Sequence, residues 1–150
     1  MKPKFIDAYM DVAERFGKLS SAKRLNVGAI IVKDNRIISI GYNGMPTGWD
    51  NNCEDSVMWK DGKQLSAPIL KSKPEVLHAE TNAIAKLAQS NDSGLESALF
   101  VTHSPCLECA KLIYQSGITT IYYKHEYRSK EGVEFLEKCK LNVHRIEAVA

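Results

Sequence analysis

Two short segments of the chain combine residue types that bind a transition metal and move protons. One is His78-Ala79-Glu80, and the other is Pro105-Cys106-Leu107-Glu108-Cys109. Two thiolates and one neutral imidazole can hold zinc, and three protein ligands leave the fourth tetrahedral position open, as in catalytic sites. A water molecule there is acidified and becomes a hydroxide nucleophile near neutral pH. We therefore predict one catalytic zinc ion, held by His78, Cys106 and Cys109.

Glu80 lies two residues after the histidine, too close to join it comfortably as a ligand of the same ion. A carboxylate beside the metal-bound water can take its proton and pass it to a substrate nitrogen, so we predict that Glu80 is the proton shuttle. Taken alone, a Cys-x-x-Cys pair also fits a structural zinc module or a dithiol oxidoreductase. The combination His-x-Glu…Pro-Cys-x-x-Cys is instead the signature of zinc deaminases.

The elements around these motifs predict how the ligands are positioned. Helical periodicity covers residues 5–16, and further helices are expected to begin at about His78, at Cys106 and after Ser129. Strands are expected at 27–32, 36–40, 98–102, 118–123 and 142–149, while 41–76 reads as a long irregular connection. This order predicts an α/β fold, a three-layer α/β/α sandwich with a five-stranded mixed sheet. Cysteines 106 and 109 would then lie on the first turn of a helix, where the helix dipole favours thiolate.

Length and composition restrict the classes of protein to consider. The 150 residues suit a single domain over 1–150, and 44% hydrophobic residues are enough for a core. Lys plus Arg number 20 against 18 Asp plus Glu, and the net charge of +2 argues against a polynucleotide or membrane surface as partner. No stretch resembles a membrane span or a signal peptide, so we expect a cytoplasmic protein.

Three segments resemble deoxycytidylate (dCMP) deaminases of the cytidine deaminase superfamily, in the compact form found in bacteriophages. They are residues 78–84, residues 104–110 and the Gly-Tyr-Asn-Gly-x-Pro-x-Gly stretch at 41–48, supported by Val27-Gly28-Ala29. The resemblance runs from about Asp7 to Val143. The zinc motifs are shared by the whole superfamily, whereas the stretch at 41–48 indicates the deoxycytidylate branch.

This resemblance implies hydrolysis of dCMP to dUMP for thymidylate synthesis, with activation by dCTP, inhibition by dTTP and assembly into a homo-hexamer in the host cytoplasm. It assigns Tyr123 to stacking on the pyrimidine and also places Asn26 and Ala79 at the substrate. Effector-site candidates are Ile38, Ile40, Tyr42, Asn43 and Gly44, with Mg²⁺ accompanying the triphosphate. An asparagine at the position of Asn43 contacts the substrate sugar in related deaminases, so this residue could serve either ligand.

A 5′-phosphate requires cations, and arginine can bind two of its oxygens at once. Arg24 is the first candidate because it matches a basic position in relatives; Lys124 and Arg128, after the fourth expected strand, are the next. Cys53 has no visible set of partner ligands, so we expect no second zinc. A tRNA-type polynucleotide deaminase shares the zinc motifs and remains the alternative within the superfamily.

Overall fold

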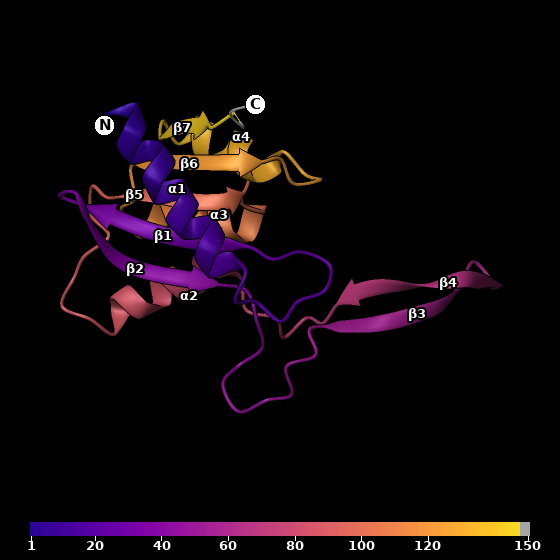
Figure 1. The fold of residues 1–150 in the computed structure, drawn as a ribbon. Coiled ribbons are helices and arrows are strands. Elements are labelled where there is room, and N and C mark those ends of the chain that lie inside the picture. Colours follow the sequence, from indigo (N-terminus) through magenta and orange to yellow (C-terminus); the bar gives the residue numbers. More distant parts are fainter. Residues whose placement is uncertain (148–150) are drawn as a thin grey trace.

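The computed structural model describes residues 1–147, which form a five-stranded sheet with helices on both faces and a separate two-stranded ribbon (Figure 1). In chain order the elements are α1 (Pro3–Gly17), β1 (Gly28–Lys33), β2 (Arg36–Tyr42), β3 (Glu54–Lys60), β4 (Lys63–Ser72), α2 (Ala79–Ala88), β5 (Ala98–His103), α3 (Leu107–Gln115), β6 (Thr120–His125), α4 (Glu131–Lys138) and β7 (Asn142–Arg145). The last expected strand, 142–149, is shorter than predicted, and residues 148–150 lie outside the described part. No helix in that part is long and apolar enough to cross a bilayer.

The main sheet has the order β2-β1-β5-β6-β7, with β1 antiparallel to both neighbours and β5, β6 and β7 parallel. Asp34 and Asn35 connect β1 to β2 with positive φ angles of 50° and 57°, the backbone that a tight two-residue hairpin turn requires. The predicted five-stranded mixed sheet is confirmed. Its parallel half places the carboxyl ends of β5 and β6 next to each other, and the Pro105-Cys106 motif follows the end of β5.

The two faces of the sheet bury separate apolar clusters. Helix α1 covers one face through Met10 and Ala13, which pack with Ile30 and Phe100. Helices α2, α3 and α4 cover the other face, so the predicted three-layer arrangement is also confirmed. Gly28 allows the close contact between α1 and β1, because a Cβ there would lie 1.8 Å from the carbonyl oxygen of Ala13.

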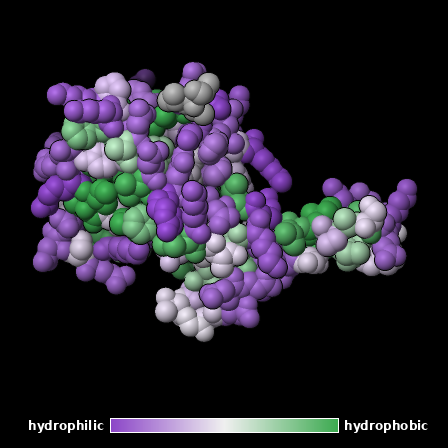
Figure 2. All heavy atoms as spheres, in the orientation of Figure 1, coloured by the Kyte–Doolittle hydropathy of each residue, from purple (hydrophilic) through white to green (hydrophobic). Residues whose placement is uncertain are grey.

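The segment expected to be irregular contains an antiparallel ribbon, β3 and β4, which we call the arm (residues 54–72). It projects from the body of the protein (Figure 1), and hydrophobic residues cover part of it (Figure 2). The side chain of Trp59 in β3 is 63% exposed. These strands could not be predicted from the sequence, because their pairing shifts between Val57 and Trp59 and because β4 contains Pro68, a residue that is unfavourable within strands. Neither strand buries one face, so the alternation that normally predicts a strand is missing.

Candidate metal centre and its pocket

Two helix N-termini bring the predicted metal ligands together. His78 is the residue that precedes α2, Cys106 precedes α3, and Cys109 lies within the first turn of α3. The Nδ1 atom of His78 is 3.3 Å from the sulfur of Cys109 and 3.7 Å from that of Cys106. The ligand atoms of all three residues lie within 4.8 Å of one another, so one ion can contact all of them.

The chemistry of this donor set fits zinc. One imidazole and two thiols are among the ligand combinations of catalytic zinc sites, and they leave a coordination position for water or substrate. Hydrogen bonds from Cys109 and from His78 lower the pKa of the Cys106 thiol to about 4, while the contact with Cys106 and burial raise the pKa of Cys109. Cys106 is therefore the thiol that ionises first, and a bound metal cation would favour the thiolate of Cys109.

Glu80 lies beside this cluster, on the first turn of α2, and is only 5% exposed. Burial raises its pKa, so its carboxyl group holds a proton more readily than a solvated glutamate does. It lines the same cavity as His78 and Cys106. A buried carboxyl group with a raised pKa next to a metal site is suited to both accepting and donating a proton.

The cavity over the cluster has a volume of about 300 Å³. Its walls come from the loop between α1 and β1, the base of the arm, the start of α2 and the segments that follow β5 and β6. Among the predicted residues, Arg24, Asn43 and Ala79 line this cavity. Sequence reasoning missed Ser72, Lys73, His103 and Tyr127, which also line it.

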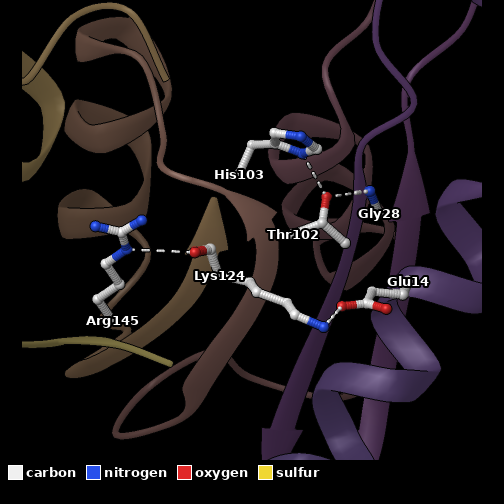
Figure 3. A network of polar contacts seen from close by, with 6 residues as sticks. All are labelled: Glu14, Gly28, Thr102, His103, Lys124 and Arg145. Atoms are coloured by element: carbon white, nitrogen blue, oxygen red, sulfur yellow. Dashed lines mark hydrogen bonds and ion pairs between the residues drawn. The ribbon is translucent and has the colours of Figure 1, made fainter. Parts of the chain in front are cut away.

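Other predicted substrate residues lie elsewhere. Lys124 forms a 2.6 Å ion pair with Glu14 of α1, and Arg145 donates to its carbonyl group (Figure 3). Asn26 donates its side-chain amide to the carbonyl oxygen of Ser20 and, like the exposed Arg128, is absent from the cavity wall. The partner of Lys124 is distant in sequence, and a pattern read along the chain does not reveal such a pair, so its contact with the phosphate stays a prediction.

Tyr123 does not line this cavity but a second pocket that Ser104 and Tyr127 also line, and its contact with the base stays a prediction. It is 8% exposed and packs in the apolar cluster under α2, α3 and α4, while Tyr122 packs on the α1 side against Phe100. The period of two in β6 sends neighbouring side chains to opposite faces, and helices cover both faces of this sheet. Neither ring therefore faces the main cavity, whereas Tyr127, four residues later, does.

The effector-site candidates divide by burial. Ile38 and Ile40 are half-buried and pack against the two apolar clusters, while Tyr42 is 37% exposed. Gly44 forms a backbone bridge to Leu77 and has open space around its Cα. Asn43 is different, because its side chain accepts from the backbone N–H of residue 27 and donates to the carbonyl oxygen of residue 25. It therefore fixes the loop that borders the cavity.

The family described as the cytidine and deoxycytidylate deaminase zinc-binding region matches residues 3–125. The chain belongs to this family. It is 33% identical to ComE operon protein 2 of Bacillus subtilis over 85% of this chain and 64% of the relative. It is also 38% identical to the deoxycytidylate deaminase of Enterobacteria phage T4, over 71% of this chain and 70% of the relative. The chain thus spans less than two thirds of the first of these relatives.

A solved structure of the family resembles this fold over nearly its whole length. It is the dCMP deaminase from the cyanophage S-TIM5 in complex with dCMP and dUMP, with a TM-score of 0.85 and 42% sequence identity. The match covers 97% of this chain and 99% of that one. The similarity therefore includes the region of the arm as well as the body of the deaminase fold.

Proposed function

We propose that this protein is a zinc-dependent deaminase that hydrolyses dCMP to dUMP and ammonia. The observation that carries the proposal is the position of Glu80, which is buried and lines the same cavity as His78 and Cys106 of the metal-ligand cluster. The dCMP and dUMP bound by the cyanophage relative support the choice of substrate. A structural zinc site has four protein ligands and no open coordination position, so it would not need a buried carboxyl group beside it.

His78, Cys106 and Cys109 would hold the zinc ion, which when bound supplies a Lewis acid that lowers the pKa of a water molecule. Glu80 would take one proton from the attacking water and deliver it to the ring nitrogen of the pyrimidine. It would then take the second proton from the same oxygen, which becomes the carbonyl oxygen of dUMP, and deliver it to the amine, which leaves as ammonia. Its raised pKa suits this double role, because a group that both accepts and releases a proton works best when its pKa approaches the working pH.

The rest of the cavity would bind the nucleotide. Tyr127 lines the cavity and takes the place expected of Tyr123 as the aromatic contact to the base. Arg24 and Lys73 supply positive charge at the wall formed by the arm base, and Arg24 is the principal phosphate ligand in this proposal. One guanidinium nitrogen of Arg24 donates to Ser72 at 3.1 Å, and the planar group has further donors for phosphate oxygens.

Regulation is proposed from the resemblance to dCMP deaminases. We propose that dCTP activates and dTTP inhibits the enzyme, with Mg²⁺ on the triphosphate, within a hexamer that supplies dUMP for thymidylate synthesis. The exposed Tyr42 and the open surroundings of Gly44 support an effector contact at the end of β2. Ile38 and Ile40 would contribute through their packing rather than by direct contact.

The test compares ammonia release from dCMP, deoxycytidine and dCTP by wild-type protein and by Glu80→Gln. We expect a preference for dCMP, and a loss in the variant of about 10²- to 10⁴-fold in kcat with zinc still bound. Glu108→Gln is the matched control, because this carboxylate lies on the first turn of α3 but is exposed and pairs with Lys111. Equal rates on the three substrates would contradict the phosphate assignment. A Cys106–Cys109 disulfide that cycles without zinc would indicate an oxidoreductase instead.

A further inference from the structure

The loop between α1 and β1 carries Arg24 across the mouth of the cavity without regular secondary structure of its own. Such a segment is held in one conformation only if its backbone polar groups find fixed partners. On one side the partner is Asn43, which binds the backbone of residues 25 and 27 at 2.8 and 3.0 Å. This contact fixes the end of the loop next to β1 but does not reach Arg24.

Glu54 holds the loop on the other side. It is the first residue of β3, it is 4% exposed, and its carboxylate accepts hydrogen bonds from the backbone N–H groups of Lys23 and Arg24. Burial of a carboxylate is costly unless its hydrogen bonds are well made, so two backbone donors at one carboxylate constitute a firm contact. The predicted function does not use this buried charge.

The residue of β4 that pairs with Glu54 also holds the side chain of Arg24. Glu54 pairs directly with Ser72 of β4, and the hydroxyl group of Ser72 accepts from the guanidinium of Arg24 at 3.1 Å. The next backbone hydrogen bond, from Lys73 to Cys53 at 2.8 Å, closes the base of the arm beside the cavity. The arm base therefore fixes both the main chain and the guanidinium of Arg24.

We infer that Glu54 is a positioning residue that holds Arg24 in place to bind the 5′-phosphate of the nucleotide. This inference rests on the proposed function, in which Arg24 contacts that phosphate. We call the contacts of Glu54 and Ser72 with Arg24 the clamp. A preordered arginine loses less conformational entropy on binding, so removal of the clamp weakens phosphate binding without changing the chemical step. The arm thus contributes to substrate selection through its base, although its outer part lies away from the cavity.

The experiment measures kcat and KM for dCMP and deoxycytidine in the wild type, Glu54→Gln, Arg24→Ala and the double variant. Glu54→Gln keeps the shape of the side chain but replaces one acceptor oxygen by a donor that opposes the backbone N–H groups. We expect KM for dCMP to rise about tenfold, the scale of a lost hydrogen bond to a charged group, with kcat within about twofold. For deoxycytidine, which lacks the phosphate, kcat/KM should stay within about twofold.

In the double variant, the Glu54→Gln change should add at most about twofold to the effect of Arg24→Ala, because both changes interrupt the same contact. Asp55→Asn is the matched control: it removes a carboxylate from the next position of β3, which is exposed, and should leave all parameters unchanged. Equal losses for both substrates, a fall in kcat alone, or additive effects in the double variant would overturn the inference.

Two further measurements keep the test decisive. If Glu54→Gln does not fold, Ser72→Ala removes the contact to the guanidinium of Arg24 instead. We then expect a smaller increase in KM, of about threefold because the lost acceptor is neutral, again for dCMP alone. Amide hydrogen exchange at residues 23 and 24 should be faster in Glu54→Gln than in the wild type, and unchanged exchange would refute the clamp. A wild type that releases no ammonia from dCMP would refute the proposed function, and the exchange result would still decide on the clamp.

Discussion

The contact between α4 and the backbone next to the metal ligand Cys106 can be tested by adding one methyl group, in the variant Gly132→Ala. Gly132 lies in the first turn of α4, and a Cβ there would lie 2.0 Å from the carbonyl oxygen of Pro105 and 2.9 Å from the backbone of Cys106. Ordinary contacts begin at 3.4 Å, so Gly132→Ala requires α4 and the Pro105–Cys106 peptide to separate by about 1.4 Å. Backbone does not yield as a flexible side chain does, and overpacking of this kind costs about 2 kcal/mol, or about 4–8 °C in Tm.

Because the displaced peptide carries a metal ligand, we also expect zinc affinity to fall by about 10- to 100-fold, the usual effect of disturbing the support of a ligand. Calorimetric unfolding measures Tm, and competition with a chromophoric zinc chelator measures the zinc affinity. Gly28→Ala is the control, since its Cβ would meet Ala13 at 1.8 Å, away from the metal ligands. It should lower Tm but keep zinc affinity. If both variants bind zinc equally well, α4 does not hold Cys106 in place.

Two other outcomes test the metal ligands and the ionisable groups at the cavity. Cys109→Ser should retain less than about a tenth of the zinc of the wild type after dialysis, because a hydroxyl is a poor ligand for zinc. Cys139→Ser changes a cysteine outside the cluster and should keep its zinc. Elemental analysis measures the zinc content of both variants. Burial, together with the nearby His125, lowers the pKa of His103, so the folded protein resists its protonation and loses stability as pH falls below the unfolded value of about 6.5. The Tm should therefore drop less between pH 7.5 and 5.5 in His103→Gln than in the wild type, and an equal drop would show that His103 is not responsible.

The metal centre could be predicted from the sequence because its geometry is set locally. Cys106 and Cys109 share a helical turn, and the motif around His78 also begins a helix. The sequence therefore left open only how the N-termini of these two helices come together in the fold. The five-stranded sheet followed in the same way from its central strands β1, β5 and β6, which are apolar and mostly buried on both faces.

The walls of the cavity could not be predicted in this way, since they depend on contacts between distant segments. Glu54 meets the loop of Arg24 from 30 positions away, and Lys124 is occupied by Glu14, 110 positions away. The resemblance assigned Tyr123 to the substrate, but the sequence did not reveal that helices cover both faces of the sheet around its strand. The arm was missed because strands without a buried face have no regular apolar pattern.

The arm divides into two parts with different freedom to vary. Its base is locked to the cavity, whereas its tip turns at Asp61 and Gly62, whose positive φ angles of 53° and 75° suit a tight reversal in open solvent. Surface turns of this kind accommodate extra residues. The tip is thus a natural place to graft an epitope or a fluorescent label, whereas length changes near Glu54 would displace the arginine beside the substrate cavity.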